Sequence, residues 1–163
     1  MINNYKNLIL LFLALVLSSC ATQPERMYIT PSGNIEVTID APYEVVKGRF
    51  IQKMALDGLN VKSDSDYQTV FIKPCGISLA CSTYKIMLGN QYSTDPDLVV
   101  TYQWLRTDKG VRIMVTSYEI TTTMPFGQVQ RASLLGNNKQ FNDAMSSLLS
   151  FKELLESEQQ AVN

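Results

Sequence analysis

The sequence predicts an α+β domain of two layers. An antiparallel sheet of about five strands carries one helix after its first strand and a long helix at its C-terminal end. In several short segments apolar and polar residues alternate, which is the period of a half-buried strand. In two longer segments apolar residues recur every three or four positions, as in a helix with one side on a core. Turn-forming residues separate these segments, and two helices on one face of such a sheet make a two-layer fold.

The first strand is followed closely by the first helix. Every second residue over 35–39 is apolar, which predicts a half-buried strand. A helix is predicted from about Ala41 to Asp57, because apolar residues recur there every four positions. These apolar residues are Val46, Phe50 and Met54. Gly58 suits the left-handed position that ends a helix, and Leu59 can then fold back on Met54.

Four further strands are predicted in the middle of the chain. They cover Tyr67–Lys73, Thr83–Leu88, Leu98–Arg106 and Val111–Thr122. Residues 60–66 are interpreted as connecting chain. The tetrapeptide from Thr107 to Gly110 suits a tight hairpin between the last two strands, with glycine at the positive-φ position.

The last predicted strand changes phase along its length. Its apolar residues are Ile113 and Val115 in the first half, and Tyr118 and Ile120 in the second. An extra residue in the strand, as in a β-bulge near Ser117, would return both pairs to the same face of the sheet.

A second helix is predicted near Lys139–Glu156. Asn137, with Gln140 three residues later, resembles a capping box. The helix carries a wide apolar face, formed by Phe141, Ala144, Met145, Leu148, Leu149, Phe151 and Leu155. The folded domain is therefore expected over residues 34–157, with a polar, disordered tail over 158–163.

The N-terminal segment has the form of an export signal. A positively charged start with Lys6 leads into ten uninterrupted apolar residues, Leu8–Leu17. As a helix these residues span about 15 Å, half of the roughly 30 Å hydrocarbon core of a bilayer, so a membrane-spanning helix is a poor interpretation. The alternative is an ordinary secretory signal that happens to contain a cysteine.

The sequence Leu17-Ser18-Ser19-Cys20 resembles the lipobox of bacterial lipoproteins at all four positions. The resemblance implies that residues 1–19 are a signal peptide, that Cys20 carries diacylglycerol, and that residues 20–33 are a flexible tether. Ala21 stands where an inner-membrane retention signal would have aspartate, so the resemblance implies an outer-membrane location with the domain facing the periplasm. A Gram-positive cell surface is the lesser alternative.

Charge and composition exclude several classes of function. Cleavage before Cys20 removes one base, Lys6, and no acid, so the net charge changes from −1 to −2. Without a basic stripe the chain lacks what nucleic-acid binding requires. The chain has no histidine, the usual general base and a common zinc ligand. We therefore expect no enzymatic activity, no metal and no cofactor.

Two weak chemical motifs remain. Ser82 and Lys85 match a Ser-x-x-Lys pattern, but a strand would direct them to opposite faces, and the companion motifs of penicillin-binding enzymes are missing. The acidic pairs Asp64/Asp66 and Asp95/Asp97 suit solvated turns better than cation sites.

Cys75 and Cys81 are predicted to form a structural disulfide. An exported domain folds in an oxidising compartment, and the five residues between these cysteines leave room for a closed loop. A redox pair would more usually show Cys-x-x-Cys spacing, and a zinc site would need further ligands.

The order of the elements resembles the helix-grip modules of BamC-like outer-membrane-assembly lipoproteins. The resemblance rests on the sequence Asp40-Ala41-Pro42-Tyr43 at the helix start, on Gly58-Leu59-Asn60-Val61 at its end, and on the long closing helix. It implies a non-enzymatic accessory or scaffold subunit with envelope protein partners. The alternative is a periplasmic carrier that binds a lipid or other small apolar ligand between sheet and helix. Its expected lining residues are Tyr102, Trp104, Phe141 and Met145, which core packing would explain equally.

Overall fold

The computed structural model describes residues 27, 28, 30, 32–76 and 79–162. The predicted signal peptide, Cys20 and most of the tether lie outside these residues. In chain order the elements are β1 (Glu36–Ile39), α2 (Tyr43–Leu56), β2 (Asn60–Asp64), β3 (Gln68–Pro74), α3 (Leu79–Leu88), β4 (Asp97–Thr107), β5 (Gly110–Thr123), η1 (Pro125–Gly127), β6 (Val129–Ser133) and α4 (Asn138–Val162).

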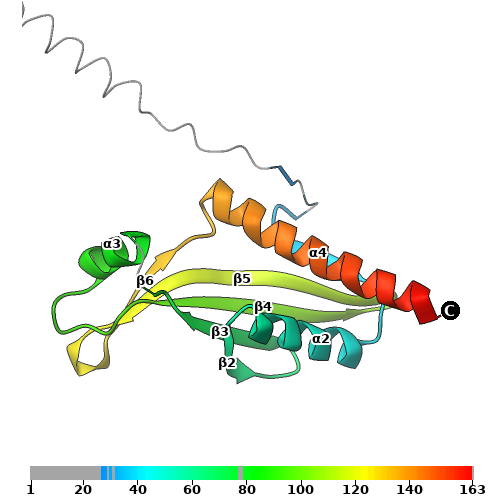
Figure 1. The fold of residues 1–163 in the computed structure, drawn as a ribbon, viewed down its shortest axis with the longest axis horizontal. Coiled ribbons are helices and arrows are strands. Elements are labelled where there is room, and N and C mark those ends of the chain that lie inside the picture. The colour runs from blue at the N-terminus through cyan, green and yellow to red at the C-terminus, as the bar shows by residue number, and fades with distance from the viewer. Residues whose placement is uncertain (1–26, 29, 31, 77–78, 163) are drawn as a thin grey trace, which may run out of the picture.

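The strands form one antiparallel sheet in the order β1-β5-β4-β3-β2, and β6 also pairs with β5. Strand β1 pairs with residues 111–114 of β5, whereas β6 pairs with residues 119–123. Because β4 occupies the other side of β5 along nearly its whole length, β1 and β6 lie end to end on one edge of it. Figure 1 shows β6 beside β5 at the end of the sheet that carries α3.

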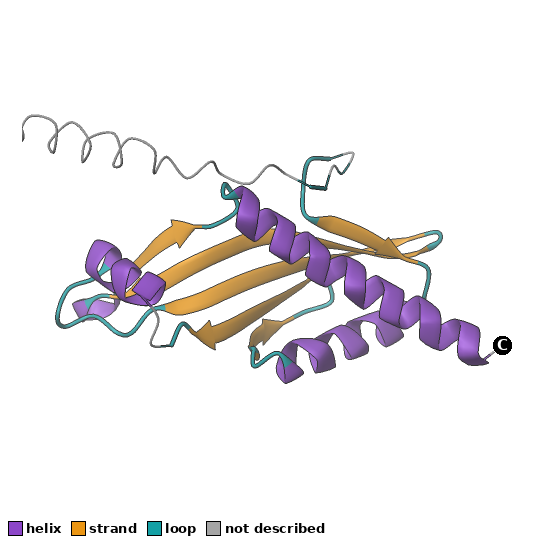
Figure 2. Ribbon diagram, turned by 45° about the horizontal axis from the view of Figure 1, so that its top comes forward, coloured by secondary structure: helices purple, strands orange, loops and turns teal. Residues whose placement is uncertain are grey.

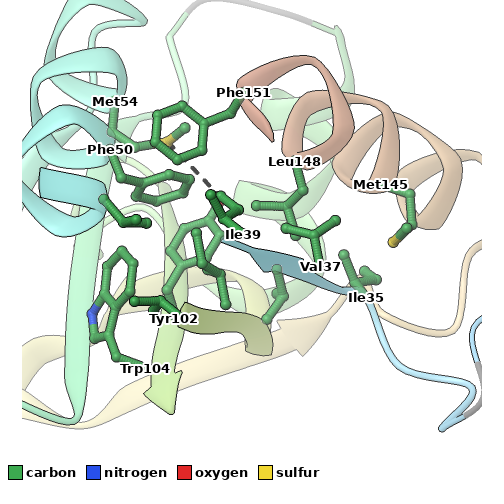
Figure 3. Close-up of a cluster of buried hydrophobic side chains, with 14 of the residues drawn as sticks. Ile35, Val37, Ile39, Phe50, Met54, Tyr102, Trp104, Met145, Leu148 and Phe151 are labelled. Atoms are coloured by element: carbon green, nitrogen blue, oxygen red, sulfur yellow. Dashed lines mark hydrogen bonds between the residues drawn. The ribbon is translucent and has the colours of Figure 1, made fainter. Parts of the chain in front are cut away.

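Helices α2 and α4 lie over the same face of the sheet (Figure 2). This confirms the predicted α+β fold with two layers. The core between the layers contains Val37 and Ile39 from β1, Phe50 from α2, and Leu148 and Phe151 from α4 (Figure 3). The apolar alternation in the strands and the four-residue spacing in the helices therefore meet in one core.

A bulge in β5 accounts for the change of phase along this strand. Thr101 lies opposite Ser117, but the next residue, Tyr102, lies opposite Val115. Thr116 is therefore the extra residue, and the apolar side chains on both sides of it face the core. The bulge predicted near Ser117 is confirmed.

The predicted C-terminal cap of the first helix and the predicted N-terminal cap of the second are also confirmed. Gly58 has φ of 81°. The amide of Leu59 donates to the carbonyl of Met54 over 2.9 Å, which is the Schellman arrangement. At the start of α4, Asn137 Oδ1 accepts a hydrogen bond of 2.9 Å from the amide of Lys139.

The strand predicted over Thr83–Leu88 is wrong, because this segment belongs to helix α3. The segment is apolar and too short for a decisive period, so its composition fits either element. The disulfide holds the third residue of α3 close to the end of β3, where a helical turn fits.

Three further boundaries differ from the sequence prediction. Residues 60–64, interpreted as connecting chain, form the edge strand β2, all of whose residues are exposed. β6 is a strand that we did not predict, and it too is mostly exposed. Helix α4 continues through residues 158–162, which were assigned to a disordered tail. The two exposed strands lack the apolar alternation on which strand prediction depends, and residues 158–162 carry few apolar side chains at a helical period.

Candidate docking surface

The four residues of the predicted ligand groove lie in the packed core. Their exposed fractions are 7% for Tyr102, 1% for Trp104, 3% for Phe141 and 3% for Met145. The indole N–H of Trp104 donates to Thr69 Oγ1 over 2.9 Å, so its polar atom is satisfied inside the protein. These side chains therefore pack as a core, and the pockets described below do not reach them.

Cys75 and Cys81 form the predicted disulfide, with their Cα atoms 5.8 Å apart. The bond joins the residue after β3 to the third residue of α3. It thereby fixes a short helix to the sheet at the end where β3 turns away from β4.

Asp64, a candidate cation ligand in the sequence, is engaged by protein groups. Its Oδ1 lies 2.9 Å from Lys47 Nζ and accepts a hydrogen bond of 2.5 Å from Thr69. Burial alone would raise the pKa of Asp64, but the hydrogen bonds from Thr69 and Lys47 outweigh it and hold the pKa below its ordinary value. The same pair raises the pKa of Lys47 against the opposing effect of burial.

In the second acidic pair, Asp95 is likewise engaged by a lysine. Asp95 lies 2.5 Å from Lys85 Nζ, so the lysine of the Ser-x-x-Lys pattern forms an ion pair at the surface. Because α3 is a helix, Ser82 and Lys85 are three residues apart on one helical side, and the expectation of opposite faces is wrong. Burial raises the pKa of Asp97. Among the described residues no group of acidic or cysteine side chains could hold a metal ion.

The face of the sheet opposite α2 and α4 carries a groove of about 500 Å³, which we call the open-face groove. It runs across β2, β3, β4, β5 and β6. Its lining consists of Lys62, Ser63, Gln68, Val70, Val99, Thr101, Thr116, Ser117, Glu119, Thr121, Val129 and Arg131. The floor is on the central strand, where Val99 and Thr101 are 9% and 8% exposed although α2 and α4 cover the other face.

Most side chains of the open-face groove are small and uncharged. Hydroxyls come from Thr101 and Thr121, and isopropyl groups from Val70 and Val99. The three charged residues are Lys62 of β2, Glu119 of β5 and Arg131 of β6, and the last two lie 3.8 Å apart. Such a surface can form hydrogen bonds with a partner across several strands, and it carries little net charge.

A smaller pocket of about 300 Å³ lies beside the disulfide, and we call it the disulfide pocket. Its lining consists of Lys73, Pro74, Cys75, Cys81, Tyr84, Leu98, Tyr118, Ile120, Leu134 and Gln140. Burial raises the pKa of Tyr118, which keeps its phenol neutral. The side-chain oxygen of Gln140 is buried and has no hydrogen-bond partner among the described residues.

Neither surface was predicted as a site. The sequence predicts the strand Leu98–Arg106, but nothing in its apolar alternation shows that the face turned away from the core is hollowed. The disulfide pocket depends on α3, which the sequence prediction placed in a strand.

No family model, curated protein or solved structure matches the chain. No helix within the described part of the chain is long and apolar enough to cross a membrane.

Proposed function

We propose that the protein is a non-enzymatic outer-membrane lipoprotein that serves as an accessory or scaffold subunit of a cell-envelope complex. Lipid on Cys20 anchors the chain, and the domain faces the periplasm. The lipobox Leu17-Ser18-Ser19-Cys20 supports the anchor. The open-face groove carries the proposed docking function, because it is a hollow of about 500 Å³ on the sheet face that α2 and α4 leave uncovered.

The proposed occupant of the open-face groove is an extended segment of an envelope protein with small, uncharged side chains. Threonine hydroxyls in the groove can pair with backbone or amide groups, and the valines offer shallow apolar contacts. Strand addition at the β2 edge is less favoured. The strand is short, its pairing with β3 shifts register between Val61 and Ser63, and Lys62 stands at that shift. These are the features that protect edge strands from pairing.

The docking surface can be tested by crosslinking in cells. A photoreactive amino acid at Thr121, inside the open-face groove, is expected to capture one envelope protein. The matched control is Thr38, which is exposed on the same sheet face in β1 but does not line the groove. Equal capture from both positions, or none from Thr121, would contradict the proposal.

A pair of variants provides a second test of the same surface. Thr121→Trp fills part of the open-face groove while retaining a residue that favours strands, so we expect it to abolish copurification of the captured protein. Thr38→Trp should leave copurification unchanged. Equal thermal midpoints for both variants would show that the loss comes from the surface and not from unfolding.

The disulfide pocket favours a second candidate function, a periplasmic carrier for a small apolar ligand. Its volume of about 300 Å³ is at the lower end of ligand sites, and Tyr84, Leu98 and Ile120 supply aromatic and aliphatic walls. A native mass spectrum of the protein extracted from its own membrane distinguishes the two functions. A bound small molecule that is lost on Leu98→Arg would favour the carrier, and a bound protein would favour the scaffold.

A further inference from the structure

One end of the molecule is free of unpaired charge. Residues 86–94 and residues 120–130 contain no Asp, Glu, Lys or Arg, in a chain that is 18% charged. The nearest charges before and after the first segment are Lys85 and Asp95, which form an ion pair with each other. We call residues 86–94 and 122–128 together the uncharged end; Thr121 and Val129, which line the open-face groove, are not part of it.

The two segments are adjacent in the fold although they are far apart in the sequence. The amide of Thr94 donates to the carbonyl of Thr123 over 2.9 Å, and the hydroxyl of Thr122 donates to the carbonyl of Thr94 over 2.8 Å. Helix α3 also contacts β5 and β6. Figure 1 shows α3 and the turn after β5 at the same end of the sheet, opposite the C-terminus of α4.

Large apolar side chains point to solvent from this end. Phe126 is fully exposed, and Ile86, Met87 and Tyr92 are 81%, 72% and 75% exposed. These residues come from the last turns of α3, the loop that follows it, and the turn between β5 and β6. Four such side chains at one end exceed the scattered single exposures that are normal on a soluble surface.

The turn that carries Phe126 holds this ring outward at a cost in backbone energy. Phe126 has φ of 69°, and it is the only residue other than glycine with positive φ in the described part of the chain. An aromatic residue rarely adopts the left-handed region, because its Cβ then approaches the backbone too closely. No described residue buries its ring, so the ring is available for a contact from outside the domain.

We propose that the uncharged end rests in the interfacial region of the bilayer to which the lipid on Cys20 anchors the chain. This proposal rests on the anchor of the proposed function. The first described residue, Met27, donates its amide to Asn142 in the first turns of α4. From there seven residues lead back to Cys20, a reach of about 25 Å. The domain is therefore held close to the bilayer, where an exposed Phe, Ile and Met can bury in the acyl boundary while Tyr, Thr, Asn and Gln remain among headgroups.

Quenching by brominated lipid tests the contact directly. The lipidated Phe126→Trp variant is reconstituted in phosphatidylcholine vesicles, with or without bromine on the acyl chains. We expect brominated lipid to remove at least half of the added fluorescence, because bromine quenches only at close contact. Trp104, which is 1% exposed in the core, provides an unquenched signal in the same sample.

Leu56→Trp is the matched control. Leu56 is 82% exposed, but it is followed by Asp57 and lies near Lys53, and these two form an ion pair. Its added fluorescence should be unaffected by bromine. Equal quenching of both variants, or an unquenched Phe126→Trp variant on anchored protein, would overturn the membrane contact alone. Protein that stays in solution when the vesicles are sedimented would overturn the anchor as well. Quenching of Phe126→Trp that is abolished by a bound envelope protein would assign this end to that protein.

Discussion

Trp104 is the side chain on which the choice between core and ligand groove depends. Its indole packs edge-on against Phe50, with ring centroids 5.4 Å apart, and its N–H bonds to Thr69. Because these contacts are internal, we expect Trp104→Ala to lower the free energy of unfolding by about 3–5 kcal/mol in urea titrations. Trp104→Phe keeps most of the packing and should cost less. A Trp104→Ala variant of unchanged stability would contradict the core assignment.

Asp64 should make stability depend on pH in the acidic range. Its pKa is lower in the folded protein than the ordinary value of 3.8, so the stabilisation is complete above that value and is lost as pH falls through the folded pKa. We expect the stability difference between the wild type and Asp64→Asn to be largest near neutral pH and to shrink below about pH 4. Urea unfolding at pH 7 and pH 3 measures it. A difference independent of pH would contradict the assigned ion pair with Lys47.

At the scale of elements, α3 should depend on the disulfide. It spans ten residues, too few for a helix to be stable alone in water. We expect replacement of Cys75 and Cys81 by serine to lower the free energy of unfolding by about 2 kcal/mol and to expose the amides of α3 to hydrogen exchange. The amides of β4 and β5 in the same sample serve as the control. Unchanged protection of α3 would show that packing alone holds this helix.

The elements that could be predicted are those with a buried face. Helix α2, strands β4 and β5 and the bulge all place apolar residues on the core at a regular period, so the period is visible in the sequence. Strands β2 and β6 lie at sheet edges with exposed side chains, and backbone pairing alone defines them. Helix α3 carries exposed apolar side chains, such as Ile86 and Met87, in addition to buried or half-buried ones. Its apolar residues therefore do not show the period of a helix with one buried side.

For the whole molecule, β5 is the strand on which assembly depends, since it pairs with β1, β4 and β6. A chain truncated after Thr107 lacks β5 and so leaves β1 without a partner. We expect this truncated chain to show no cooperative unfolding transition by circular dichroism. A chain truncated after Glu156 keeps the buried Leu155 and is the control that should still fold.

The site was less predictable than the fold because it depends on residues that are far apart in the sequence. A core residue can be predicted from its own apolar side chain and from the spacing of the apolar residues around it. The open-face groove depends on side chains that five strands bring together, and the uncharged end depends on a contact between Thr94 and Thr123, which no local pattern encodes. The sequence does contain two segments without charged residues, 86–94 and 120–130. Only the fold shows that these segments lie at the same end of the molecule.

The pairing of β1 with β5 also governs when the protein can fold. Residues 36–39 pair with residues 111–114, so about seventy residues must follow β1 before its backbone groups can form hydrogen bonds with β5. Closing such a long loop costs entropy that no early contact repays. A chain that is threaded through a translocation channel from its N-terminus, as the proposed leader requires, would thus remain unfolded during passage. For the proposed export, the late pairing of β5 would keep the first half of the chain from completing its sheet until β5 has passed through the channel.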